Sequence, residues 1–152
     1  MSKKTKPHPL ELQTHDILPT HSVTDPKLTR AFAIEAARTL ADAKCSDIVV
    51  LDVQGLSQIT DFIVIGSGTS DRQMHAAAQH VGELAQEQHF PLFRRNVDER
   101  TTWIVLDLVD CIVHVFEPNA RALYDLEMLW GDAPNVKWER PGEKRRHAPE
   151  PE

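Results

Sequence analysis

The sequence lacks the features of a membrane or exported protein. None of its apolar runs reaches the roughly 18 residues that a membrane-spanning helix needs. The first 25 residues contain no apolar core of the secretory kind. Only two cysteines occur, Cys45 and Cys111, in or beside apolar segments and without CxxC spacing. We therefore expect a cytoplasmic protein with two buried free thiols rather than a disulfide or a metal site.

Positive charge is also scarce. The chain carries 17 basic against 23 acidic residues, which gives a net charge of −6. Its clustered basic residues lie near the two ends, at Lys3, Lys4 and Lys6 and at Lys144, Arg145 and Arg146. Neutralising nucleic-acid phosphates needs clustered lysine and arginine, so we expect little direct nucleic-acid binding. The acidic body instead suits a basic protein partner, because complementary charge speeds encounter.

The apolar segments lie between residues 28 and 130, and both ends of the chain are polar. Residues 1–25 contain three prolines and three histidines without sustained periodicity, which indicates a flexible leader. Residues 132–152 are polar and proline-rich, and we expect the chain to fray from Gly131 onward. One domain is therefore expected at residues 26–131, long enough to bury a core.

Hydrophobic periodicity predicts the order helix, strand, strand, helix, three strands, helix. The expected elements are residues 26–43, 47–53, 61–66, 70–88, 91–95, 103–108, 111–117 and 118–130. Asp25 is expected to cap the first helix, with Pro26 at its first position. The sixth and seventh elements are so close that they predict an antiparallel hairpin. The order predicts a single α/β domain with a mixed sheet of about five strands and helices packed on it.

Apolar stripes indicate which face of the outer helices is buried. The first helix is expected to bury Leu28, Phe32, Ala36 and Leu40. The last helix is expected to bury Leu123, Leu126, Leu129 and Trp130.

The segment GSGTSDRQ, residues 66–73, joins an expected strand to an expected helix and raises the question of a phosphate site. A dinucleotide fingerprint needs a third glycine where this chain has Asp71, whose charge would repel a pyrophosphate. A P-loop needs Gly-Lys-Ser/Thr at the helix entrance, and none is present. We favour a tight corner whose glycines allow unusual backbone angles and whose Thr69 or Ser70 caps the helix.

A metal-dependent nucleotidyltransferase is the enzymatic alternative. Such enzymes also place Gly-Ser after a strand, here Gly66 and Ser67, near carboxylates that hold metal ions. Asp107, Asp110 and Glu117 are the carboxylates on the later strands that could serve. They lack the Asp-x-Asp spacing that puts two carboxylates on one face of a strand. We therefore expect no catalysis, no metal and no cofactor.

Histidine supplies no convincing catalytic group either. His114 lies mid-strand without a serine or cysteine in a plausible elbow, which favours a hydrogen-bonded, half-buried histidine. His75 and His80 are five residues apart and so do not share a helix face for metal binding.

Three pieces of the sequence resemble the ribosomal silencing factor family, also termed RsfS or Iojap-like proteins. They are DIVVLDVQGLSQITDFIVIGSGTSDRQ, WIVLDLVDCIVHVFEPNAR and LYDLEMLW, in the family's order and close to its spacing. The resemblance implies a nucleotidyltransferase-like fold without established transferase activity. It also implies docking on the large ribosomal subunit through ribosomal protein L-fourteen, which blocks joining of the small subunit and reduces translation when nutrients run short. Organelle relatives assist large-subunit assembly, the second alternative, and isolated members are often homodimers.

The resemblance also marks single positions. Trp103 matches a tryptophan of the family's partner-binding region, and other signature positions are matched by Asp110, His114, Arg121, Tyr124 and Trp130. The residues predicted to bind the partner are Trp103, Asp107, Asp110, Arg121 and Tyr124.

Physical reasoning leaves alternatives for several of these positions. Trp103 is either an interface anchor or a core tryptophan. Arg121 could pair with Asp110 or Glu117, or could meet the partner. Tyr124 is expected to be partly exposed, beside the apolar stripe of its helix.

Two departures from the family pattern affect the expected loops. Arg95-Asn96-Val97 stands where the family usually has Glu-Gly, and Val109-Asp110 where it usually has Gly-Asp. A valine at a position with positive φ is costly, so the hairpin geometry could differ locally.

Overall fold

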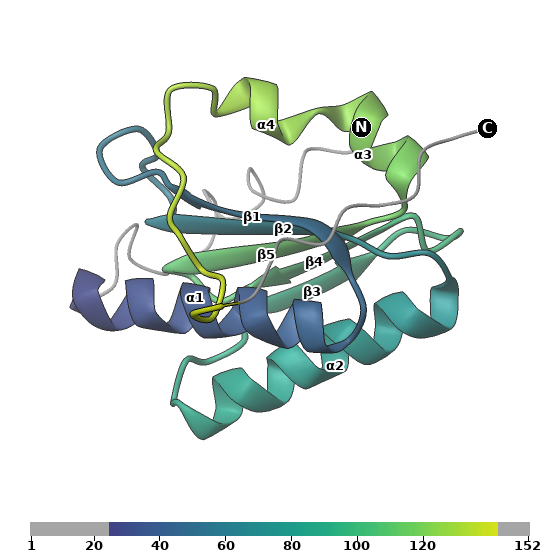
Figure 1. The fold of residues 1–152 in the computed structure, drawn as a ribbon, viewed down its shortest axis with the longest axis horizontal. Coiled ribbons are helices and arrows are strands. Elements are labelled where there is room, and N and C mark those ends of the chain that lie inside the picture. The colour runs from purple at the N-terminus through teal and green to yellow at the C-terminus, as the bar shows by residue number, and fades with distance from the viewer. Residues whose placement is uncertain (1–24, 143–152) are drawn as a thin grey trace, which may run out of the picture.

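A mixed sheet forms the middle layer of the molecule, with helices on both of its faces (Figure 1). The structure, a computed structural model, describes residues 25–142. Its elements are α1 (Pro26–Asp42), β1 (Ser46–Asp52), β2 (Phe62–Ser67), α2 (Asp71–Glu87), β3 (Arg94–Val97), β4 (Trp103–Asp107), β5 (Cys111–Phe116), α3 (Pro118–Tyr124) and α4 (Leu126–Leu129). Apart from Asp25, the expected leader lies outside these described residues, as do residues 143–152 of the expected tail.

The five strands lie in the order β1-β2-β5-β4-β3. β2 and β5 are parallel, and the other neighbouring pairs are antiparallel. This confirms the predicted mixed five-stranded α/β domain and the β4–β5 hairpin, whereas the nucleotidyltransferase-like name stays a prediction. Trp103 pairs with Phe116 and Asp107 with Ile112, so Trp103 lies at the open end of the hairpin and Asp107 at its turn.

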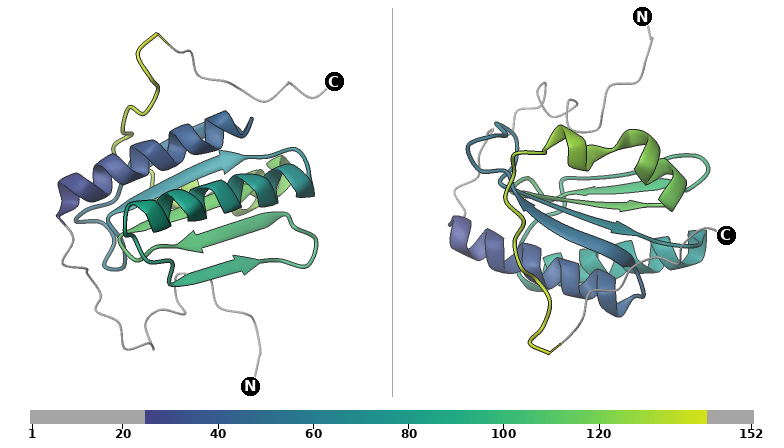
Figure 2. Two further views of the ribbon diagram at one scale, coloured as in Figure 1. Left: turned by 90° about the horizontal axis from the view of Figure 1, so that it is seen from below. Right: turned by 45° about the horizontal axis from the view of Figure 1, so that its top comes forward.

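The two long helices lie side by side across one face of the sheet (Figure 2, left panel). The larger core cluster fills this layer, and the rings of Phe32 and Phe90 stack there with centroids 4.5 Å apart. The opposite face carries a smaller core cluster, in which Ile63, Ile65 and Leu126 are buried. The short helices α3 and α4 lie on this second face (Figure 2, right panel).

The corner between β2 and α2 starts a helix as predicted, but its glycines serve packing. Ser70 Oγ accepts a hydrogen bond from an N–H of the first turn at 3.1 Å, which confirms it as the cap. A Cβ on Gly68 would lie 2.5 Å from Cγ of Met74, and one on Gly66 would lie 3.0 Å from Cδ1 of Leu40. Neither glycine has a positive φ, so the prediction of unusual backbone angles is wrong. Close approach of helix and sheet explains them instead.

The predicted range of β3 and the predicted buried position in the first turn of α1 are both wrong, each displaced by one or a few residues along the chain. β3 spans Arg94–Val97 rather than 91–95, because pairing begins only where the N–H of Phe93 meets a β4 carbonyl. Leu28 is 61% exposed rather than buried. Thr29 takes the inward position in the first turn of α1, which Asp25 caps as predicted.

The predicted final helix is two short helices that meet at Asp125. This residue has left-handed backbone angles, φ 49° and ψ 55°, which end one helix and begin the other. Leu126 is buried and Trp130 packs on the smaller core cluster, as predicted. Leu123 and Leu129 are 78% and 65% exposed, so the prediction that they are buried is wrong. A single helical stripe does not continue through the break.

The segment after α4 is ordered where the sequence predicted fraying. Residues 134–136 form backbone hydrogen bonds with residues 50–52 at the outer edge of β1. Trp138 is 3% exposed, and its indole N–H donates to the carbonyl of Ile48 at 3.0 Å. Residues 134–140, here termed the C-terminal clasp, run from the α4 side past β1 to α1 (Figure 1, yellow). The expectation of fraying is wrong for these residues, because this short segment completes the sheet edge.

Candidate partner-binding surface

Four aromatic rings meet at the open end of the β4–β5 hairpin. Trp103 begins β4, His114 and Phe116 lie on β5, and Tyr124 ends α3. The ring centroid of Trp103 lies 4.9 Å from that of Phe116 and 4.5 Å from that of Tyr124. The indole Nε1–H of Trp103 donates to Nδ1 of His114 at 3.0 Å. These four residues, the aromatic cluster, join the sheet to α3.

Exposure within the aromatic cluster rises from the sheet toward α3. His114 is fully buried, so the expectation of a half-buried histidine is wrong, although its hydrogen bonding is confirmed. Trp103 is half-buried and packs on the smaller core cluster, which shows part of the core role considered for it, and its role as an interface anchor stays a prediction. Tyr124 is 52% exposed, as predicted.

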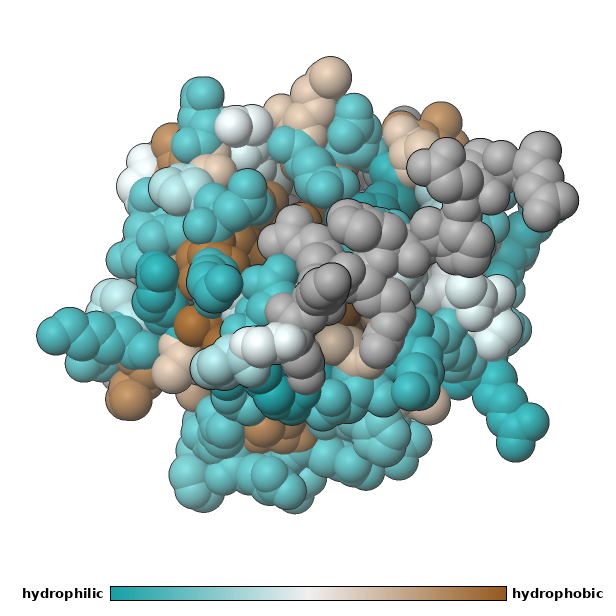
Figure 3. All heavy atoms as spheres, viewed as in Figure 1, coloured by the Kyte–Doolittle hydropathy of each residue, from teal (hydrophilic) through white to brown (hydrophobic). Residues whose placement is uncertain are grey.

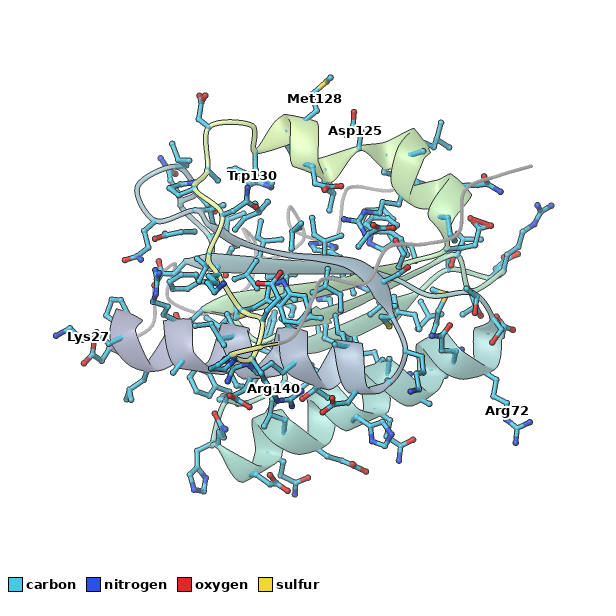
Figure 4. The ribbon with its side chains drawn as sticks, viewed as in Figure 1. Lys27, Arg72, Asp125, Met128, Trp130 and Arg140 are labelled. Atoms are coloured by element: carbon cyan, nitrogen blue, oxygen red, sulfur yellow. The ribbon has the colours of Figure 1, made fainter. Side chains whose placement is uncertain are left out.

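An apolar ridge projects beside the aromatic cluster. Four large side chains of α3 and α4 are more than half exposed: Leu123 (78%), Tyr124 (52%), Met128 (76%) and Leu129 (65%). These four residues are termed the α3–α4 ridge. Figure 3 shows apolar side chains at the top edge of the molecule among hydrophilic ones, and Figure 4 shows Met128 pointing outward there. Large apolar side chains exposed together on two neighbouring helices make this surface a candidate interaction site.

Arg121 lies on α3 but faces inward. Its Nε and Nη2 donate to the two carboxylate oxygens of Glu127, each at 3.1 Å. Its Nη1 donates to Oγ of Ser67, at the end of β2, at 2.8 Å. The side chain is only 12% exposed. Arg121 therefore pairs with Glu127 and not, as considered, with Asp110 or Glu117.

Asp107 and Asp110 lie at the opposite end of the β4–β5 hairpin from Trp103. Both are nearly fully buried, at 4% and 5% exposure. Burial raises the pKa of the Asp107 carboxyl, and the N–H of Val109, which donates to it at 2.9 Å, opposes that change. The structure thus brings together three of the five predicted partner-binding residues and separates these two from them.

The residues of the nucleotidyltransferase hypothesis do not form one site. Gly66 and Ser67 lie at the end of β2 beside Phe116, whereas the backbone of Asp110 bonds the opposite end of β2, at Phe62. The length of β2 separates the two groups by roughly 16 Å. Among the described residues, no three His, Cys, Asp or Glu side chains are grouped to hold a metal.

The two cysteines are buried free thiols, as predicted. Burial, and after it the nearby carboxylates of Asp110 and Asp107, raises the pKa of the Cys111 thiol. The thiol is therefore uncharged near neutral pH, and a neutral buried thiol is not a nucleophile.

Asp98 positions Trp103 from the β3–β4 turn, a role that the sequence did not indicate. Its Oδ1 accepts the backbone N–H of Thr102 at 2.6 Å and that of Trp103 at 3.0 Å, and its Oδ2 accepts the Thr102 hydroxyl. Partial burial raises the pKa of Asp98, but these hydrogen bonds outweigh it, so the pKa lies below its ordinary value. An aspartate in the polar turn NVDER was the only available signal.

The two departures from the family pattern have separate structural consequences. Arg95 donates to Nδ1 of His75 at 3.1 Å and so ties β3 to α2. Val109 has φ 71°, the positive value expected for a position where the family usually has glycine.

Comparison with known proteins gives one consistent family. The family model described as "Ribosomal silencing factor during starvation" matches residues 26–152. A "Ribosomal silencing factor RsfS" from Halalkalibacterium halodurans is 41% identical over 104 residues, which cover 68% of this chain and 89% of that protein. "Protein Iojap, chloroplastic" from Arabidopsis thaliana is 33% identical over 119 residues, which cover 78% of this chain and 50% of that protein.

The same likeness extends to the fold. A crystal structure of a protein from Chromobacterium violaceum matches with a TM-score of 0.63 and 30% sequence identity, covering 80% of this chain and 98% of that one. No helix within residues 25–142 has the length and apolar character to cross a bilayer. The family match includes the aromatic cluster, the α3–α4 ridge and the C-terminal clasp, and the chain belongs to the ribosomal silencing factor (RsfS) family.

Proposed function

We propose that the protein is a cytoplasmic ribosomal silencing factor that docks on ribosomal protein L-fourteen of the large subunit. It blocks the small subunit by occupying the surface that this subunit must meet, and it represses translation under nutrient limitation without catalysis or a cofactor. The observation that carries this proposal is the α3–α4 ridge, an exposed apolar surface beside Trp103 in a chain whose relatives are named ribosomal silencing factors.

The ridge has the chemistry of a protein-binding surface. Burying its leucine and methionine side chains against a partner stabilises a complex by roughly 1.5–3 kcal/mol for each fully desolvated side chain. Tyr124 adds a stiff aromatic group, and its ring packs against that of Trp103 with centroids 4.5 Å apart. A modest interface of this kind is sufficient, because the protein blocks the small subunit merely by remaining bound at the surface that this subunit must meet.

Charge beside the ridge favours a basic partner. Asp125 and Asp132 are exposed at the break and just after α4, whereas Arg121 is turned inward toward Glu127. Figure 4 shows Asp125 pointing outward between the two helices. Exposed carboxylates within and beside an apolar surface complement a basic protein surface and disfavour RNA phosphates.

Within this proposal the predicted partner-binding residues have different tasks. Trp103 and Tyr124 form the aromatic edge of the contact, next to the leucines of the ridge. The Arg121 side chain is turned inward and acts through its hydrogen bonds to Glu127. Asp107 and Asp110 shape the distant hairpin turn and do not touch the partner.

Co-sedimentation with separated ribosomal subunits tests the proposal. Wild-type protein should pellet with the large subunit and reduce its joining to the small one. Leu129→Asp should weaken binding more than about tenfold, because a charge replaces an apolar contact at the interface. Leu92→Asp is the matched control, since Leu92 is also an exposed leucine (45%) but lies outside the ridge.

The outcomes separate the alternatives. Wild-type protein that stays in the supernatant would refute the proposed function. Normal binding by Leu129→Asp would keep the function but remove the ridge as its site. Binding to immature large-subunit particles without any effect on subunit joining would favour the assembly role.

A further inference from the structure

The two helices that carry the α3–α4 ridge are held on the sheet by little apolar burial. α3 has seven residues, none of them buried, and α4 has four, of which only Leu126 is buried. Helices shorter than about 12 residues are marginal on their own in water. The direction of the ridge therefore depends on polar contacts as well as on the packing of Tyr124, Leu126 and Trp130.

The guanidinium of Arg121 supplies such a contact. It donates two hydrogen bonds to Glu127 on α4 and one to Ser67 at the end of β2. Ser67 is 3% exposed and lies in the sheet beside Phe116, so it is a rigid attachment point. A two-bond arginine–carboxylate contact fixes direction as well as distance. One side chain of α3 is thereby fastened both to α4 and to the sheet.

This contact spans the break at Asp125. The carbonyl of Arg121 accepts the N–H of Asp125 at 2.9 Å, and its guanidinium reaches Glu127 on the far side of the break. Aspartate tolerates left-handed angles better than most residues other than glycine, but the conformation still costs free energy and persists where its surroundings hold it. The backbone bond to Asp125 does not depend on the side chain at position 121, but the guanidinium links α3 to Glu127 on α4 and to Ser67 on β2, so it holds the angle between the two helices.

We infer that Arg121 is a positioning residue for partner binding, which rests on the proposed function of the ridge. Through Glu127 and Ser67 it sets the arrangement of Leu123, Tyr124 and the α4 side chains that the partner meets. Without it α4 samples other orientations, and the affinity falls with the fraction of molecules that keep the competent one. This role replaces the direct partner contact that the resemblance suggested for Arg121.

The test compares Arg121→Ala and Arg121→Lys with the matched control Arg140→Ala. Arg140 also makes a two-bond contact with a carboxylate, that of Asp42 at 3.1 and 3.0 Å, and lies beside α1 on the far side from the ridge (Figure 4). Both Arg121 variants should bind purified large subunits about tenfold more weakly, because lysine keeps the charge but not the planar fork. Arg140→Ala should bind like wild type. Arg121→Ala combined with Glu127→Ala should lose no more than Arg121→Ala alone.

Amide hydrogen exchange of the free protein separates positioning from direct contact. In both Arg121 variants, amides of residues 122–130 should exchange faster, while those of β2 and β5 keep their wild-type protection. Weakened binding with unchanged exchange at 122–130 would overturn the inference, because Arg121 would then contact the partner itself. Normal wild-type binding with an unaffected Arg121→Ala variant would overturn the inference alone. Failure of wild-type protein to bind would overturn the proposed function, and this inference with it.

Discussion

Val109 carries backbone strain in the turn between β4 and β5. Its φ is 71°, and the N–H of Asp110 donates to the carbonyl of Leu108 across it at 2.8 Å, which makes a γ-turn. A β-branched residue is a poor occupant of this conformation. The turn persists because Asp107 accepts the N–H of Val109 at 2.9 Å and Leu108 donates to Cys111 at 2.9 Å.

Val109→Gly should therefore stabilise the protein. Glycine adopts a positive φ without steric conflict, and relief of the strain outweighs its greater freedom when unfolded, for a gain of about 1 kcal/mol. The gain should raise the midpoint of urea unfolding. Val109→Ala is the control, because it shortens the side chain and keeps a Cβ at positive φ. A lower midpoint for Val109→Gly would mean that the valine side chain contributes more by packing than it costs in strain.

At the scale of elements, the C-terminal clasp pairs with β1, the edge strand of the sheet, and covers it. It bonds β1 through residues 134–136 and inserts Trp138 between β1 and α1, where Arg38 donates to the Trp138 carbonyl at 2.7 Å. An unpaired edge strand is prone to associate with other chains. The clasp covers that edge of β1 within the molecule.

Trp138→Ala should destabilise the protein by about 3 kcal/mol or more, because it removes a large buried side chain and leaves a cavity. Trp138→Phe should cost less, since it keeps most of the volume and loses the hydrogen bond to Ile48. Urea unfolding measures both losses. Lys137→Ala changes an exposed neighbour in the clasp and should be nearly neutral. A Trp138→Ala variant as stable as Lys137→Ala and wild type would show that the clasp does not stabilise the fold.

The elements with strong local signals could be predicted, and those that depend on distant contacts could not. Asp25 and an apolar stripe define α1, and β-branched runs define the central strands. The break at Asp125 has no comparable signal, because Arg121 supports it through Ser67, 54 residues away in sequence. The exposure of Leu123 and Leu129 follows from that break, so the sequence pattern does not indicate it either. In the clasp only Val136 and Trp138 show strand spacing, too short a pattern to recognise.

At the scale of the whole molecule, the two faces of the sheet are covered differently. α1 and α2 cover one face and bury most of the core, and the ridge projects from the other face (Figures 1 and 2). A partner bound at the ridge leaves the α1–α2 layer facing away from it. That layer then supplies the bulk that excludes the small subunit in the proposed mechanism.

The net charge of −6 gives the last prediction. If the ridge meets a basic protein surface, long-range attraction speeds association, and salt screens it over distances of about 10 Å at 0.1 M. Association with large subunits should slow by about tenfold between roughly 50 and 500 mM salt, while dissociation from the apolar contact changes little. Stopped-flow kinetics across a salt series measures both rates. Replacing Asp125 and Asp132 by asparagine should flatten the salt dependence without altering dissociation. Association that speeds up with salt would contradict a basic partner, because an acidic chain approaching RNA phosphates is repelled until salt screens the repulsion.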